Sequence, residues 1–124
     1  LWSALIDVQI KSSLIDDEVR LVETIAVGEC VEELISNAVR HGSANRIEIE
    51  ISRGELQSIL VSAVDDGEGI TSPKPGLGFH LFDHLSRGNW ATGRDEATGK
   101  NSVKVFIDSS VLLDIDEDEQ PPLH

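Results

Sequence analysis

The chain has 124 residues, about the length of one ordinary domain, and its 40% hydrophobic residues suffice for a single core. Its formal net charge of −13 argues against a nucleic-acid-binding protein, whose binding surface is normally basic, and means that local groups must hold any phosphate ligand. No stretch reaches the roughly 18 uninterrupted apolar residues of a membrane helix.

The compartment is predicted from the same features. No signal peptide is visible, and the first residue is not methionine, so we expect a fragment of a longer protein that makes no direct membrane contact itself. The single cysteine, Cys30, cannot form an internal disulfide. A reducing compartment, the cytoplasm, is therefore expected.

A strand and then a long helix are predicted in the first third of the chain. Residues 6–11 alternate apolar and polar side chains, as a half-buried strand does. The acidic residues 16–18 favour a helix start, and we expect a helix over residues 17–41, ended by Gly42. Its second half carries one apolar stripe at three- and four-residue spacing, which consists of Val27, Cys30, Val31, Leu34, Ile35, Ala38 and Val39.

The remaining elements predict a sheet with helices on one side. Residues 46–51 and 58–64 form a hairpin, of which the second strand is more apolar and therefore more central. A helix over residues 77–85 and an alternating strand over residues 102–108 complete the pattern. We therefore predict an α/β two-layer sandwich over residues 1–110, with a mixed, mostly antiparallel sheet covered on one face by helices. Residues 111–124 are expected to be an acidic, solvated tail.

Three polar residues on the long helix are the first candidate for chemistry. Glu33, Asn37 and His41 are spaced by four, so they form one row that flanks the apolar stripe. A cavity between the helix and the sheet would open at this boundary. An ordinary polar boundary has the same spacing, so this row alone does not identify a site.

Two glycine-containing segments are the second candidate. Asp65 ends a strand, where its carboxylate can accept a hydrogen bond from an exocyclic amino group, and Gly67 and Gly69 allow the backbone to approach a ligand closely. Gly76 and Gly78 open a predicted helix, where free N–H groups suit phosphate oxygens. The first segment is too short for an EF-hand calcium loop, and the second lacks the Gly-Lys-Ser/Thr of a Walker A loop. A plain acidic turn remains the alternative for the first segment.

The order of these motifs resembles the GHKL superfamily of ATPases, which have the Bergerat fold. Its N box is similar to Glu33-Leu34-Ile35-Ser36-Asn37-Ala38-Val39-Arg40-His41, and its two glycine boxes are similar to Asp65-Asp66-Gly67-Glu68-Gly69 and Gly76-Leu77-Gly78-Phe79. The superfamily includes sensor histidine kinases, anti-sigma-factor serine kinases, type II topoisomerases and certain chaperones. The resemblance covers about residues 5–108.

The resemblance implies a role for each matching residue. Asn37 would coordinate Mg²⁺ on the ATP phosphates, and Glu33 would polarise, deprotonate or orient the attacking group. Asp65 would bind the adenine amino group. The glycines Gly67, Gly69, Gly76 and Gly78 would shape the adenine pocket and wrap the triphosphate, and Arg40, His41 and Ser102 would supply further contacts to phosphate, Glu33 or adenine. Phosphoryl transfer needs positioning and charge neutralisation more than covalent help, and Mg²⁺ prefers few protein ligands, so this set is sufficient.

The chain departs from the family in three places. Residues 70–75, between the glycine boxes, form a short lid like that of a compact subfamily of sensor kinases. Glu29 stands where that subfamily has an arginine, and Phe79 replaces the usual leucine.

His80 and His84, four residues apart on the second helix, could suggest a metal pair, but no third ligand is evident and solvated helix positions are favoured.

The resemblance therefore leads to one principal hypothesis and two alternatives. The principal hypothesis is the Mg-ATP-binding catalytic domain of a sensor histidine kinase, which phosphorylates a histidine on a separate dimerisation domain and acts upstream of a response regulator. The first alternative is an anti-sigma-type serine kinase. The second is a degenerate nucleotide-binding module that works as an interaction domain.

Overall fold

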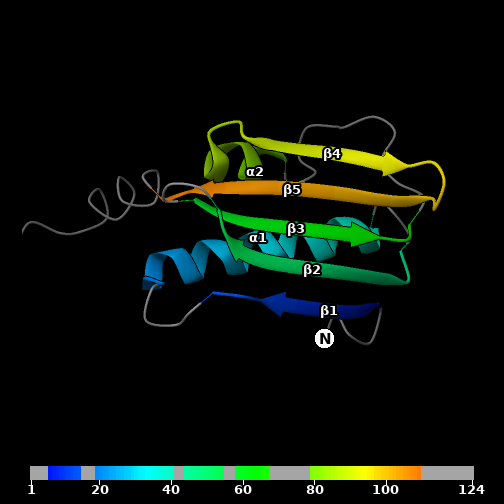
Figure 1. The fold of residues 1–124 in the computed structure, drawn as a ribbon, viewed down its shortest axis with the longest axis horizontal. Coiled ribbons are helices and arrows are strands. Elements are labelled where there is room, and N and C mark those ends of the chain that lie inside the picture. The colour runs from blue at the N-terminus through cyan, green and yellow to red at the C-terminus, as the bar shows by residue number, and fades with distance from the viewer. Residues whose placement is uncertain (1–5, 15–18, 41–43, 55–57, 68–78, 110–124) are drawn as a thin grey trace, which may run out of the picture.

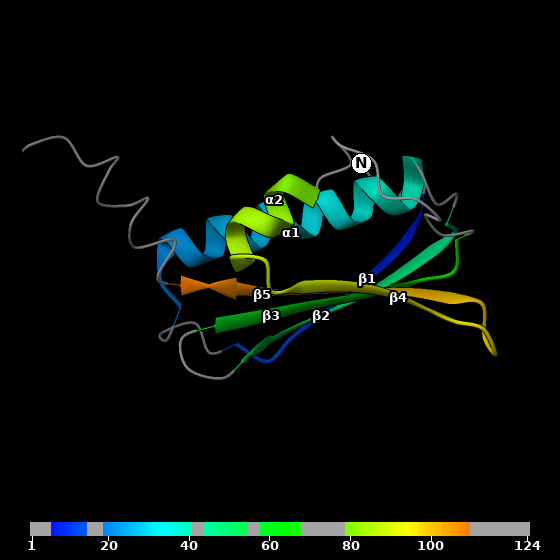
Figure 2. The ribbon, with the colours of Figure 1, turned by 90° about the horizontal axis from the view of Figure 1, so that it is seen from above.

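The computed structural model describes residues 6–14, 19–40, 44–54, 58–67 and 79–109, and in this part of the chain two helices pack on one face of a five-stranded sheet (Figures 1 and 2). The sheet order is β1-β2-β3-β5-β4, with β1 and β2 parallel and the other pairs antiparallel. This confirms the predicted two-layer sandwich. The elements are β1 (Asp7–Ser12), α1 (Leu21–Arg40), β2 (Arg46–Arg53), β3 (Ser58–Asp65), α2 (Phe79–Ser86), β4 (Trp90–Asp95) and β5 (Lys100–Asp108).

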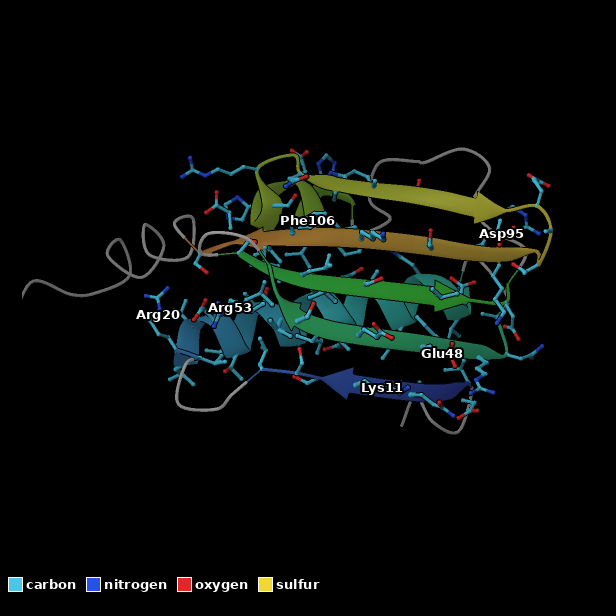
Figure 3. The ribbon with its side chains drawn as sticks, in the orientation of Figure 1. Lys11, Arg20, Glu48, Arg53, Asp95 and Phe106 are labelled. Carbon is cyan, nitrogen blue, oxygen red and sulfur yellow. The ribbon has the colours of Figure 1, made fainter. Side chains whose placement is uncertain are left out.

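The core lies between the helices and the sheet, and the periodicity of the sequence explains it. In β2, β3 and β5 alternate residues are buried, while the residues between them face the open side of the sheet, which Figure 3 shows toward the viewer. The predicted stripe of α1 is confirmed, although Val31 and Val39 are only partly buried at its edge. Phe82 and Leu85 of α2 complete the same cluster.

The helix start predicted at residue 17 is wrong, because α1 begins at Leu21. Glu23 determines this boundary: its Oε1 accepts a hydrogen bond from the backbone N–H of Arg20 at 3.1 Å, which is the glutamate half of a capping box. Residues 15–18, and the predicted last residue His41, lie outside the described residues. Glu23 is only 3% exposed, so the cap is also part of the interior.

Strand β4 was not predicted, and the last strand begins two residues earlier than expected. All residues of β4 after Trp90 are exposed, so this edge strand lacks the apolar alternation by which strands are recognised. Its hairpin with β5 turns through Gly99, which has a positive φ of 71° and donates to the carbonyl of Asp95 at 2.7 Å. Trp90 anchors the strand by packing on Phe82, with ring centroids 5.9 Å apart.

Cys30 offers a direct measure of core integrity. The side chain is completely buried in α1, and burial, together with the neighbouring Glu33 carboxylate, raises the pKa of its thiol to about 12. Thiolate is the reactive form, so we expect a thiol reagent such as a disulfide dye to react with Cys30 at least about a hundredfold more slowly in the native protein than in denaturant. Equal rates in the two conditions would show that α1 is not packed on the sheet.

Candidate functional site

Two of the predicted site residues lie one turn apart on the C-terminal half of α1. Glu33 and Asn37 are both half-buried, beside the fully packed Leu34 and Ala38, as the helical spacing predicts. Arg40 is the last residue of α1 and is exposed. An amide and a carboxylate at the edge of the core can hold polar ligands without the cost of full burial.

The end of α1 is joined to the end of β3 by a short path of hydrogen bonds. The N–H of Ala44 donates to the carbonyl of Ala38 at 3.0 Å. Next along the chain, the N–H groups of Asn45 and Arg46 both donate to Oδ1 of Asp66, at 2.8 and 3.0 Å. These two backbone donors lower the pKa of the exposed Asp66 carboxyl group. The role of Asp66 is thus structural, because it ties the segment after α1 to the strand that carries Asp65.

Asp65 is held by two hydrogen bonds at the C-terminal end of β3. Its Oδ1 accepts from the N–H of Gly67 at 2.8 Å and from Nδ2 of Asn101 at 3.1 Å. Asn101 Nδ2 also donates to the carbonyl of Gly67 at 2.9 Å. Asp65 is half-buried and Gly67 is buried, so the carboxylate is fixed at the edge of the interior instead of moving freely in solvent.

Asn101, and not Ser102, is the residue of β5 that contacts Asp65. In the register of the sheet Asp65 pairs with Asn101, whereas Ser102 pairs with Val64. Successive strand residues point to opposite faces, so Ser102 is on the open face of the sheet while Asp65 and Asn101 share the helix-covered face. The structure therefore does not bring Ser102 together with Asp65. The alternation itself could have shown Asn101, because it continues the inward-facing series of Val103, Val105 and Ile107 as its one polar member.

The remaining predicted residues are outside the part of the chain that the structure describes, or are exposed. His41, Gly69, Gly76 and Gly78 lie outside the described residues. His80 and His84 are exposed on α2. Within the described ranges, no cluster of three or more histidine, cysteine or acidic side chains could hold a metal ion. In the same ranges no helix combines the length and the apolarity needed to span a membrane.

The predicted site is at one end of the molecule. The end of β3 and the C-terminal half of α1 lie at the same end of the sandwich, together with the end of β4, where Asp95 lies (Figures 1 and 3). A cavity of about 350 Å³ lies elsewhere, where the N-terminal part of α1 faces the ends of β1 and β2. The described residues that line it carry aliphatic or hydroxyl side chains: Ser12, Leu14, Val19, Thr24, Val27 and Ile51.

Comparison with known proteins gives the same assignment as the motifs. The family model described as histidine kinase-, DNA gyrase B- and HSP90-like ATPase matches residues 23–107, more than half of the chain. A comparison with curated protein sequences found no match.

Several solved histidine kinases have a similar fold. The histidine kinase domain of the Erythrobacter litoralis EL346 blue-light activated histidine kinase is 19% identical, with a TM-score of 0.62 over 94% of this chain and 57% of that domain. The mycobacterial sensor histidine kinase MprB is 15% identical, with a TM-score of 0.57 over 84% of this chain and 82% of that one. The catalytic domain of the histidine kinase ThkA is 14% identical, with a TM-score of 0.54 over 86% of this chain and 82% of that one.

The first of these structures is considerably longer than this chain, which spans 57% of it. At such low identity the similarity establishes the fold, while the family is established by the matched sequence model together with the motifs around Asn37 and Asp65. The chain therefore belongs to the family of histidine kinase-, DNA gyrase B- and HSP90-like ATPases.

Proposed function

We propose that this chain is the Mg-ATP-binding catalytic domain of a sensor histidine kinase, which donates the γ-phosphoryl group of ATP to a histidine on a separate dimerisation domain. One observation carries the proposal: a carboxylate fixed by two hydrogen bonds, Asp65, lies at the same end of the sandwich as the Glu33 and Asn37 row of α1. Adenine would be bound at the end of β3 and the phosphates near the end of α1.

The residues present fit the magnesium ion that such a reaction needs. Mg²⁺ takes hard oxygen ligands, often only one or two from the protein with the rest from phosphates and water. The amide oxygen of Asn37, half-buried on α1, is such a ligand, and the bound ion would neutralise charge on the transferring phosphoryl group. Glu33, one turn earlier on the same helix, would orient or deprotonate the attacking group.

The partners follow from the same proposal. The acceptor histidine would be on a dimerisation domain of the same full-length protein, and a response regulator in the cytoplasm would receive the phosphoryl group next. We favour a histidine acceptor over the serine acceptor of an anti-sigma-type kinase because the solved structures described above are histidine kinases. Incubation with ATP and the purified dimerisation domain of the full-length protein, followed by acid and alkali treatment, tests it: phosphohistidine is acid-labile, whereas phosphoserine is acid-stable.

Calorimetric titration with ATP in the presence and absence of Mg²⁺ tests the nucleotide site. We expect Asn37→Ala to weaken Mg-ATP binding about tenfold or more while leaving Mg-free ATP binding nearly unchanged, because only the metal-dependent part of the affinity is removed. Ser62→Ala, on the open face of β3, is the control and should change neither affinity. If the unchanged protein binds no ATP at millimolar concentration, the degenerate interaction module becomes the better assignment.

A further inference from the structure

A row of three polar side chains crosses the sheet at the end where Asp65 lies. Asp65 of β3, Asn101 of β5 and Arg94 of β4 are direct cross-strand neighbours. Oδ1 of Asn101 accepts a hydrogen bond from Nη1 of Arg94 at 2.7 Å, while its Nδ2 donates to Oδ1 of Asp65 at 3.1 Å. The three groups therefore form one continuous chain of hydrogen bonds.

The chemistry of the two outer groups fixes the direction of the amide between them. A guanidinium group can only donate hydrogen bonds, and a carboxylate can only accept them. The amide of Asn101 satisfies both neighbours in one orientation alone, with its oxygen toward Arg94 and its NH₂ group toward Asp65 and the Gly67 carbonyl. Without Arg94, the amide oxygen would lose its donor, and only the Asp65 carboxylate and the Gly67 carbonyl would still hold the amide in this orientation.

This chain of hydrogen bonds leaves one carboxylate oxygen available in a defined direction. The Gly67 N–H and Asn101 both donate to Oδ1 of Asp65. Among the described residues, Oδ2 accepts no hydrogen bond, so this oxygen retains its capacity to accept one from a ligand. The exocyclic amino group of adenine is a donor, whereas guanine presents a carbonyl oxygen at the same ring position, and that oxygen would be repelled by the carboxylate.

We propose that Asn101, held in one orientation by Arg94 and by the Gly67 carbonyl, is a positioning residue that makes this site select adenine over guanine nucleotides. The inference rests on the proposed nucleotide-binding function, and it adds to it two residues outside the sequence motifs. Neither residue would touch the phosphates, so both would act on the choice of base without acting on phosphoryl transfer.

Calorimetric titration with Mg-ATP and with Mg-GTP tests the proposal. The measured quantity is the dissociation constant for Mg-GTP divided by the dissociation constant for Mg-ATP, which is large when the site prefers adenine. In Asn101→Ala we expect this ratio to fall by about tenfold, because the change removes a hydrogen bond to a charged carboxylate. In Arg94→Met we expect a smaller fall, because the Gly67 carbonyl and Asp65 still hold the amide of Asn101. Arg94→Lys retains a cation that can donate to the amide oxygen and should keep most of the preference for ATP.

The matched control is Arg87→Met. Arg87 forms an exposed ion pair with Asp108, with Nε and Oδ2 3.7 Å apart, at the other end of β5. This control removes the same type of side chain and should leave the ratio unchanged. A general loss of structure in any variant would lower both affinities together and leave the ratio as it was, and thermal unfolding of each variant would reveal it.

A second measurement does not depend on nucleotide. In an NMR spectrum of the free protein, the side-chain NH₂ protons of Asn101 should exchange more slowly with solvent than those of exposed amides, and Arg94→Met should reduce this protection, because the amide oxygen loses its donor. Unprotected protons in the unchanged protein would overturn the inference. So would ATP binding with an unaltered base preference in Asn101→Ala, which would leave the proposed function intact. If the unchanged protein binds neither nucleotide, the proposed function fails and the inference fails with it.

Discussion

Replacing Asp65 with asparagine should weaken ATP binding by about 10- to 100-fold without unfolding the protein. The new side chain can still accept hydrogen bonds from the Gly67 N–H and from Asn101 through its Oδ1. Its NH₂ group must then occupy the position of Oδ2, where it would face the amino group of adenine, donor against donor. The substitution therefore reverses the polarity of the one atom proposed to recognise the base, and preserves the local backbone.

The adjacent acidic residue provides the control. Asp66 uses its carboxylate to hold the backbone N–H groups of Asn45 and Arg46 through a single oxygen, Oδ1. The substitution Asp66→Asn keeps one acceptor oxygen for these two donors, so ATP affinity should change by less than about threefold. Isothermal titration of both variants makes the comparison. Equal ATP affinity in Asp65→Asn and the unchanged protein would contradict the assignment of Asp65 to adenine.

The largest expected effect on stability is at Glu23, at the opposite end of α1. Its Oε2 accepts hydrogen bonds from Ser109 at 2.7 Å and from Nη1 of Arg53 at 3.2 Å, and its Oε1 accepts from the Arg20 N–H. This one buried carboxylate therefore joins the start of the helix to the end of β2 and to the residue after β5. Figure 3 shows Arg20 and Arg53 at the same end of the molecule.

We expect Glu23→Ala to reduce the free energy of unfolding by about 3 kcal/mol, a large part of the roughly 5–15 kcal/mol typical of a domain. The loss has two parts. The helix cap is removed, and the donors of Arg53 and Ser109 lose the carboxylate that accepts their hydrogen bonds. Glu48→Ala is the matched control, because Glu48 pairs with Arg46 at 3.1 Å on the exposed surface and should cost less than about 1 kcal/mol. Urea denaturation followed by circular dichroism gives both values. Equal losses of stability in Glu23→Ala and Glu48→Ala would show that the buried contacts of Glu23 contribute no more than an exposed ion pair.

The contribution of Glu23 should depend on pH. Burial acts to raise the pKa of its carboxyl group, but hydrogen bonds from Ser109, the Arg20 N–H and Arg53 outweigh burial and leave the pKa below its ordinary value of 4.5. A lowered pKa in the folded state means that the ionised form stabilises the fold above pH 4.5, and that this stability is lost as the pH falls through the folded pKa. The difference in stability between the protein and Glu23→Gln should therefore be constant above about pH 5.5 and shrink in more acidic solution. Because the pKa of Asp66 is also lowered, the difference between the two proteins, and not the unchanged protein alone, is the informative quantity.

The sequence alone determined the fold class, the buried faces and the identity of the motif residues. Strict alternation in β2 and the three- and four-residue spacing in α1 are local signals, because the side chains that they place on one face are neighbours in any strand or helix. The order of the N box and the glycine boxes likewise depends only on the chain. These signals were sufficient to predict the two-layer sandwich and to select Asn37 and Asp65.

The tertiary structure decided which distant residues meet those positions. Nothing local to Glu23 shows that it is buried against Ser109, 86 positions away, and the acidic residues 16–18 suggested a different start of the helix. Likewise, Asn101 rather than Ser102 contacts Asp65 because the antiparallel register of β3 and β5 pairs the two residues on one face of the sheet. Arg94 joins them only because β4, an exposed edge strand without apolar alternation, pairs in register with β5. Alternation along β5 can place Asn101 on the inward face, but register between strands is set by packing across the sheet and by turns, so the local sequence cannot pair Asn101 with Asp65 or Arg94.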